Sequence, residues 1–384
     1  MSLPEVDIRA PRARDERIRA MEGTGTPPRS FGVEEEYLLL DATSGTPVNS
    51  AAEVILATPE LGEKTEREFL SSQLETATPI CHQAEEAEEV LAAFRRTVAE
   101  AAASCGVVLA GTGLPPLGGE TVATVTPKPR YQLIASETRN VAKHQYSTGT
   151  HVHVEVPSPD AGVEVLARLA RWAPALLAMT ANSPLWCGEP TGFASWRHVM
   201  GLSWPVAGYP QGFEDGEDYA LSVAALIDSG VVPDAGMLSW VARLSANYPT
   251  VELRIADSQL EAADAVAFAA IVRALVDRAL TETERGEDRP RYRPGTVNGA
   301  DWIAARNGMG SELIDPLRER SMPAFELVEH MLCTVEEELD RFGDRERVER
   351  FVQRLRDEGD PATRQLAAFE SEGVEGVLGL YRMA

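Results

Sequence analysis

Hydrophobic residues recur along the chain with two different periods. Stretches in which every second residue is hydrophobic predict β-strands, because side chains two apart lie on the same face of a strand. The predicted strands cover residues 31–40, 69–77, 107–111, 148–156 and 248–257. Stretches with helical spacing of the hydrophobic residues predict helices at about residues 83–104, 160–181, 260–283, 311–341 and 344–371.

The order of these elements predicts the fold class and the domain organisation. Strands and helices interleave without the regular repeat of a doubly wound sheet, so the pattern predicts an α+β fold. We expect a single domain with a mostly antiparallel, curved sheet flanked by helices, whose concave polar face would form the active site. This domain would cover residues 30–384, after a flexible N-terminal arm at residues 1–29. Proline, glycine and charged residues at 285–300 predict a long surface loop.

Charged residues follow the same two-residue period inside the predicted strands. Glu34 and Glu36 fall on one face of the first strand, whereas Val33, Glu35 and Tyr37 fall on the other. The later strands repeat this division into an apolar and a polar face. If the strands form one sheet, its polar face would collect Glu34, Glu36, Gln73, Glu75, His151, His153, Glu155, Glu252 and Arg254.

So many carboxylates on one face require neutralisation. Two carboxylates about 4 Å apart repel each other by roughly 4 kcal/mol at an effective dielectric constant of about 20. Several together are tolerated only if they are protonated or bind divalent cations. Carboxylate oxygens with one or two imidazoles suit Mg²⁺ or Mn²⁺, and Mg²⁺ commonly bridges carboxylates to nucleotide phosphates. The polar face therefore indicates metal-assisted phosphoryl transfer.

Each of these patterns also has an ordinary structural explanation. Consecutive glutamates commonly form a solvated run, His-x-His on a strand is commonly exposed or hydrogen-bonded, and Glu-x-Arg commonly forms a surface pair. The shared two-residue period of the strands favours a site over these explanations. Other catalytic motifs are absent from the sequence, which has no P-loop, no Gly-x-Ser-x-Gly elbow and no His-Glu-x-x-His.

The composition limits which classes of binding partner and which cellular compartment are expected. The formal net charge of −24 repels phosphate backbones and argues against nucleic acid. The four cysteines are scattered without paired spacing, which argues against a disulfide framework or a zinc site and favours a reducing cytoplasm. Arg168 and Arg171 interrupt the most hydrophobic segment, residues 163–186, so no membrane span is expected.

Several segments together resemble a known enzyme family. In chain order they are Phe31-Gly-Val-Glu-Glu-Glu-Tyr, Glu68-Phe-Leu-Ser-Ser-Gln-Leu-Glu-Thr-Ala-Thr-Pro, Arg130-Tyr-Gln, Gly149-Thr-His-Val-His-Val, Ala181-Asn-Ser-Pro, Thr191-Gly-Phe-Ala-Ser-Trp-Arg, Tyr248-Pro-Thr-Val-Glu-Leu-Arg-Ile-Ala-Asp and Asn298-Gly-Ala-Asp-Trp-Ile-Ala-Ala-Arg-Asn-Gly. Over about residues 30–345 the sequence resembles the second, bacterial family of glutamate–cysteine ligases, the carboxylate–amine ligase type.

The resemblance implies a catalytic fold like that of glutamine synthetase and the guanido kinases. It implies ATP as co-substrate and two or three Mg²⁺ (or Mn²⁺) ions as cofactors. The implied metal ligands are Glu34, Glu36, Glu68, Glu75, His151 and Glu252. The implied surface for ATP and glutamate includes His153, Asn182, Arg197 and Arg254. Of these, Arg254 and Arg197 would act in catalysis by holding developing negative charge.

The implied reaction joins small molecules. The γ-carboxylate of glutamate would be activated by ATP as an acyl phosphate, and the amine of an amino acid such as cysteine would then displace phosphate. Glu155 and Glu189 depart from the family pattern, so a different amine or acid stays open. The same residues could instead belong to a metal-dependent hydrolase that uses His151 and His153, or to a catalytically idle relative. A homo-oligomer is compatible with the sequence.

Overall fold

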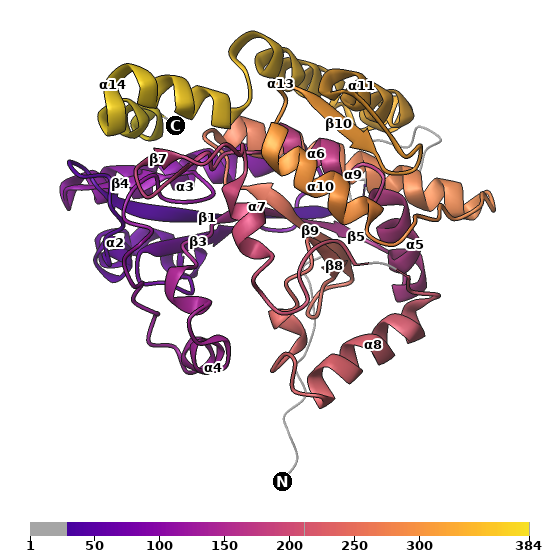
Figure 1. Ribbon diagram of the computed structural model, residues 1–384, viewed down its shortest axis with the longest axis horizontal. Helices are drawn as coiled ribbons and strands as arrows, with labels where there is room; N and C mark the ends of the chain where they lie inside the picture. Colours follow the sequence, from indigo (N-terminus) through magenta and orange to yellow (C-terminus); the bar gives the residue numbers. More distant parts are fainter. Residues whose placement is uncertain (1–28, 211, 384) are drawn as a thin grey trace, which may run out of the picture.

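The computed structural model describes residues 29–210 and 212–383, and within them a seven-stranded antiparallel sheet forms the centre of the molecule (Figure 1). The strands lie in the order β2-β3-β1-β5-β9-β8, and β4 pairs with the far end of β1. Their bounds are β1 Phe31–Asp41, β2 Glu66–Arg67, β3 Gln73–Ala77, β4 Val107–Ala110, β5 Gly149–Glu155, β8 Ala242–Leu244 and β9 Thr250–Asp257. The predicted N-terminal arm lies outside the described residues, apart from Arg29.

Strand pairing brings residues that are distant in the sequence into register. Glu36 of β1 lies opposite Glu75 of β3, and Glu34 lies opposite His151 of β5. Because side chains alternate between the faces of a sheet, these groups share one face. The predicted α+β fold with an antiparallel sheet is therefore confirmed, and so is the polar face.

Helices cover the opposite, apolar face of the sheet. Val33 of β1 and Leu253 of β9 are buried there, in one large core cluster. This cluster includes residues of α3 (Ala84–Ser104), α5 (Pro159–Leu169) and α9 (Ala262–Glu284). Burial of valine and leucine side chains of this kind stabilises the fold by about 1.5–3 kcal/mol for each side chain.

The middle glutamate of the Glu34–Glu36 run points into this helical layer. Glu35 is fully buried and forms an ion pair of 2.7 Å with Arg95 of α3, whose side chain is 5% exposed. The hydroxyl of Tyr37 also donates to Glu35. Glu35 is thus a structural residue, separated by the sheet from its two neighbours.

The polar face is flanked by shorter helices and loops. In Figure 1, α4 (Pro129–Thr138), α7 (Trp196–Gly201) and α8 (Gly216–Asp228) lie below the sheet, on the side opposite α9. Residues of α4 and α7 line a cleft here, and no residue of α8 does. The polar face therefore stays accessible at the cleft.

The C-terminal third adds a further layer beyond α9. Its elements are α10 Thr296–Asn307, β10 Glu312–Asp315, β11 Arg320–Pro323, α11 Ala324–Thr334, α12 Glu336–Phe342, α13 Arg345–Glu358 and α14 Pro361–Met383. The remaining elements are α2 Ala51–Ala57, η2 Pro59–Lys64, η3 Ala142–His144, α6 Ala173–Met179, β6 Leu185–Trp186, β7 Glu189–Pro190 and η4 Ala235–Met237.

The predicted helix at 311–341 is wrong in its first part, which forms the β10–β11 hairpin. Pro316 follows the last residue of β10, and proline disfavours the helical conformation in the residue before it. Leu313 and Met322 pair across the hairpin and are both buried. The helical part begins only at Ala324, because packing of the hairpin against α10 and α11 overrides the local spacing.

Three other predicted boundaries also differ. The helix predicted at 160–181 breaks between α5 and α6, where Pro174 stands in the first turn of α6. The helix predicted at 344–371 breaks at Gly359, which has a φ of 81°. The loop predicted at 285–300 ends early, because α10 begins directly after Gly295.

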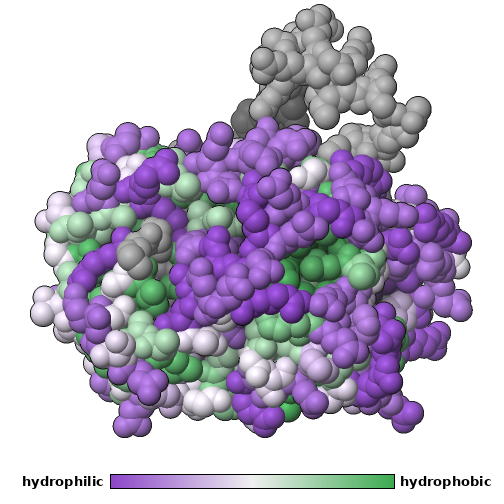
Figure 2. Space-filling model, turned by 90° about the horizontal axis from the view of Figure 1, so that it is seen from above, coloured by the Kyte–Doolittle hydropathy of each residue, from purple (hydrophilic) through white to green (hydrophobic). Residues whose placement is uncertain are grey.

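The outer surface is largely hydrophilic. Seen from above in Figure 2, hydrophilic residues cover much of the molecule, and hydrophobic residues emerge in separate patches. Among residues 29–210 and 212–383, none of the helices combines the length and the apolar character that crossing a bilayer requires.

Candidate active site

Three carboxylates converge at one end of the polar face. Glu36 and Glu75 come from neighbouring positions of β1 and β3, and Glu68 follows β2. The backbone N–H of Gly149 donates to Glu36 at 2.7 Å, and the hydroxyl of Tyr131 donates to Glu68 at 2.8 Å. We call Glu36, Glu68 and Glu75 the acidic cluster.

The acidic cluster holds protons that isolated carboxylates would release. Burial and the charge of Glu68 raise the pKa of Glu36 to about 7. Burial, together with the charges of Glu68 and Glu36, raises the pKa of Glu75 well above its ordinary value. Like charges in a poorly hydrated place are the cause in both cases. A divalent cation would remove this repulsion.

Two histidines and two further glutamates lie beside the acidic cluster. Glu34 lies 3.4 Å from His151 Nδ1 and 3.4 Å from His153 Nε2. Burial opposes ionisation of Glu34, but its hydrogen bonds to both imidazoles outweigh burial and lower its pKa. Burial and the charge of Arg254 lower the pKa of His151 to about 4, so this imidazole is neutral at pH 7.

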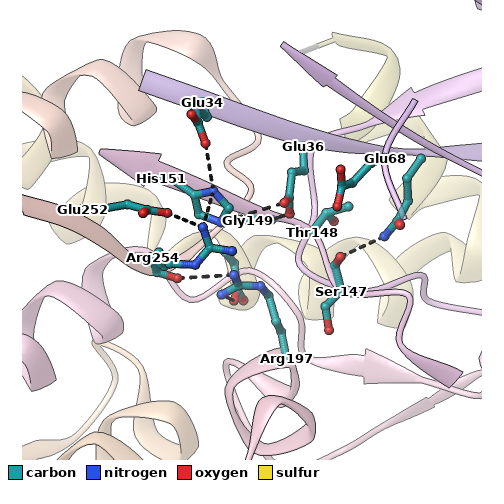
Figure 3. Close-up of polar contacts among 12 residues, drawn as sticks. Glu34, Glu36, Glu68, Ser147, Thr148, Gly149, His151, Arg197, Glu252 and Arg254 are labelled. Atoms are coloured by element: carbon teal, nitrogen blue, oxygen red, sulfur yellow. Dashed lines mark hydrogen bonds and ion pairs between the residues drawn. The ribbon is translucent and has the colours of Figure 1, made fainter. Parts of the chain in front are cut away.

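Arginines balance the charge of Glu252. Figure 3 shows the Arg254 side chain between Glu252 and His151; its Nη1 contacts Glu252 Oε1 and lies 3.3 Å from His151 Nδ1. Arg243 of β8 makes two hydrogen bonds to Glu252, of 2.8 Å and 3.0 Å. Burial opposes ionisation of Glu252, but Arg254 and Arg243 outweigh it and lower its pKa.

Arg197 reaches the site from α7. Its guanidinium lies 3.6 Å from the buried Asp257, and its Nη2 donates to the backbone carbonyl of Arg254 at 3.3 Å. A Cβ atom at Gly149 would come within 2.3 Å of Arg197 Nη2. Glycine at this position is therefore needed for the arginine to lie against β5.

His153 and Asn182, which the family resemblance assigns to the substrate surface, are both bound to neighbouring polar groups of the protein. His153 Nδ1 lies 3.0 Å from the hydroxyl of Thr250, and His153 is 9% exposed. Asn182 is fully buried, and its amide donates to the carbonyls of Gly111 and Ser258. Asn182 is not among the cleft-lining residues, so its side chain fixes the loop behind the site.

A cleft opens in front of these groups, with a cavity volume of about 230 Å³. Its polar side is lined by Glu36, Glu68, His151, Arg197 and Arg254. The rest of its lining is largely apolar and includes Phe69, Ile134, Leu202, Trp204, Met237 and Trp240. Glu155 and Glu189, the two acidic departures from the family pattern, are both exposed and do not line this cleft.

The donor set fits a divalent cation. Glu34, His153 and Glu252 each offer one ligand atom, and these atoms lie within 4.8 Å of one another. Among the described residues, the Nε2 atom of His151 is buried without a hydrogen-bond partner. An unpartnered imidazole nitrogen beside these carboxylates matches the oxygen and nitrogen ligands that Mg²⁺ and Mn²⁺ accept.

The sequence patterns did not predict three residues that the tertiary structure brings to the site. Tyr131 and Asp257 stand inside segments that carry the family resemblance, yet neither was given a role. Arg243 stands on a three-residue strand, which is too short for an alternation to be recognised. The sequence feature that could have indicated Arg243 is an arginine placed shortly before Glu252-Leu253-Arg254, at a position that pairs with Glu252 if the two segments form a hairpin.

Comparison with known proteins identifies the family. The sequence matches glutamate–cysteine ligase family 2 over residues 30–379. The chain belongs to this family. The resemblance inferred from the sequence is thereby confirmed, together with the general class of the protein, that of a ligase.

Relatives of known name and structure agree with this family. A protein of Salinispora tropica named "Putative glutamate–cysteine ligase 2" is 39% identical over 90% of this chain and 92% of its own length. One of the same name from Rhodopirellula baltica is 35% identical over 90% and 94%. The crystal structure of glutamate–cysteine ligase from Francisella tularensis in complex with AMP covers 93% of this chain and 88% of its own, with a TM-score of 0.68 at 12% identity. At that identity the likeness to the crystal structure concerns the fold alone.

Proposed function

We propose that this protein is an ATP- and Mg²⁺-dependent ligase that joins the γ-carboxylate of glutamate to the amine of an amino acid, with cysteine as the leading acceptor. One observation carries the proposal above all. Glu36 and Glu68 of the acidic cluster line the same cleft as the guanidinium groups of Arg197 and Arg254. Phosphoryl transfer from a nucleotide needs both kinds of group, carboxylates for metal ions and fixed positive charge for phosphoryl oxygens.

The metal ligands would be the carboxylates and imidazole on the polar face. They are Glu34, Glu36, Glu68, Glu75, His151 and Glu252, with two or three ions between them. When bound, Mg²⁺ would neutralise the phosphates of ATP. The raised pKa values of Glu36 and Glu75 support this role, because burial and neighbouring carboxylates disfavour their charged forms and a bound cation would offset both effects.

The arginines would hold the charge that develops during transfer. A carboxylate oxygen of glutamate attacks the γ-phosphorus of ATP, the bond to the β,γ-bridging oxygen breaks, and ADP leaves. Arg254 and Arg197 reach the cleft from β9 and α7, where their fixed guanidiniums would stabilise the phosphoryl oxygens. His153 would contribute to the same surface, and Asn182 would support it by fixing the loop that leads to Arg197.

The second half of the reaction forms the amide. The nitrogen lone pair of the acceptor attacks the acyl carbon, the bond to the phosphate oxygen breaks, and the amine loses a proton. Phosphate is a good leaving group, so no side-chain nucleophile is required. The apolar side of the cleft would exclude water that would otherwise hydrolyse the acyl phosphate.

Coupled turnover tests this function. Purified protein with Mg²⁺ and ATP should release ADP only when both glutamate and an amine are present, and mass spectrometry should detect the amide product. Glu252→Gln should abolish turnover, whereas the matched control Glu155→Gln, an exposed glutamate outside the cleft, should retain it. Hydrolysis without ATP would favour a metal-dependent hydrolase, and nucleotide binding without turnover would favour an idle relative.

A further inference from the structure

Arg243 is a buried arginine whose hydrogen bonds reach in two directions. It is 8% exposed and stands on the short edge strand β8, opposite Glu252. Its Nε and Nη2 donate to the two carboxylate oxygens of Glu252. Its Nη1 donates to the backbone carbonyls of Gly236 at 3.0 Å and Leu238 at 2.9 Å. One guanidinium thus joins a site carboxylate to a loop.

That loop is a wall of the cleft. Residues 236–241 all line the cleft, and they contribute much of its apolar side. The segment contains the short 3-10 turn η4 and a single β-bridge between Trp240 and Gly208. Backbone hydrogen bonds of Val241 to Gly208 and Arg254 hold its C-terminal end. Arg243 holds the part before that end, because it binds the carbonyls of both Gly236 and Leu238.

We propose that Arg243 is a positioning residue that couples the Glu252 carboxylate to the cleft wall formed by residues 236–241. This role rests on the proposed function, in which Glu252 binds a metal ion. Arg243 binds both oxygens of Glu252, while Arg254 contacts Oε1 alone. A shift of this carboxylate would move the guanidinium, and with it the wall.

The other end of the wall is tied to the acidic cluster in a similar way. Asp234 accepts two hydrogen bonds from Arg130 of α4, of 3.1 Å and 3.0 Å. The next residue, Tyr131, donates to Glu68. A Cβ atom at Gly236 would come within 2.8 Å of the Arg130 guanidinium, so the wall is fitted closely to this arginine. Both ends of the wall therefore lead to carboxylates of the site.

Only an arginine can make this set of contacts. Its planar group offers parallel donors for a carboxylate and a further edge for carbonyls, whereas a lysine ammonium is a single point of charge. Arg243→Lys keeps the charge and removes the geometry. This variant separates positioning from simple charge balance, and it is less disruptive to folding than removal of the charge.

Hydrogen exchange and metal binding, measured on the full chain, test the proposal. In Arg243→Lys, amide exchange at residues 236–241 should rise about tenfold and Mn²⁺ affinity, measured by electron paramagnetic resonance, should fall by about tenfold, as expected for residues that orient metal ligands. Glu252→Gln should increase exchange in the same segment. The control is Arg171→Gln, which breaks a 2.8 Å ion pair with Asp315 outside the cleft and should change neither quantity.

Two outcomes would overturn the proposal. One is wild-type exchange at residues 236–241 together with wild-type Mn²⁺ affinity in Arg243→Lys. The other is a uniform rise in exchange over the whole chain, which would assign Arg243 to general stability. Hydrogen exchange is measured without substrates, so it reports on the coupling whether or not the protein is a ligase. Failure of the proposed ligase function would appear separately, as a wild-type protein without ligase activity.

Discussion

The carboxylate of Asp257 lies 3.6 Å from the guanidinium of Arg197 and also accepts hydrogen bonds from the hydroxyls of Ser183 and Ser195. Asp257 is the last residue of β9 and is fully buried. It therefore connects the sheet to both ends of the loop that carries Arg197 to the cleft. The orientation of this arginine depends on a residue that does not itself line the cleft.

Arg197→Gln is expected to lower kcat/KM for ligation by about 100-fold, as loss of one fixed charge at a developing anion does. Asp257→Asn should lower it less, because asparagine keeps an oxygen that accepts from one serine and an NH₂ that can donate to the hydroxyl of the other, but it loses the charge that orients Arg197. Steady-state kinetics measures both effects. Wild-type kcat/KM in a correctly folded Arg197→Gln protein would contradict the catalytic role.

Glu75→Gln should raise the folding stability of the metal-free protein but weaken its stabilisation by metal. In metal-free buffer at pH 8, urea denaturation should show a higher free energy of unfolding, because burial and the charges of Glu68 and Glu36 disfavour the ionised carboxylate that glutamine replaces. The same variant should lose stabilisation by Mg²⁺ and lose turnover, since a ligand is missing. Destabilisation of the metal-free variant would show that Glu75 is not repelled by Glu36 and Glu68.

Metal binding should depend on pH through Glu36. Its pKa rises from 4.5 to about 7 on folding, so a proton competes with Mg²⁺ below about pH 7 and the affinity should fall by up to about tenfold per pH unit. In the metal-free protein, the folding stability should instead fall as the pH rises. The stability that this group contributes is complete below pH 4.5 and is lost as the pH rises through about 7.

Calorimetric titration with Mg²⁺ at pH 6 and pH 8 measures the first effect, and urea denaturation over the same range measures the second. Glu36→Gln should abolish the pH dependence of stability that arises from this group. An unchanged pH profile in this variant would assign the proton to another carboxylate.

The three consecutive glutamates should separate by function. Arg95→Met should lower the free energy of unfolding by about 3–5 kcal/mol, because it leaves Glu35 buried without its ion pair. Thermal denaturation measures this loss. Glu35→Gln should leave metal affinity unchanged, because Glu35 lies on the helical face. Reduced Mn²⁺ binding in Glu35→Gln would mean that the assignment of faces is wrong.

Local geometry explains why much of the candidate site was predictable. Alternation along a strand is fixed by covalent structure, so the sequence by itself separated Glu34 and Glu36 from Glu35 before any contact was known. The ordered segments that resemble the family then specified the sheet and its ligase class. These conclusions required only neighbouring residues and their order in the chain.

Other features were decided by the tertiary structure alone. The hairpin at Glu312–Pro323 formed where helical spacing predicted a helix, because strand pairing and packing outweigh weak local preferences. The burial of Asn182 behind the cleft, and the contact of Arg243 with both Glu252 and the cleft wall, depend on residues from separate elements. A sequence pattern fixes which face a side chain occupies, but only packing fixes which groups meet there.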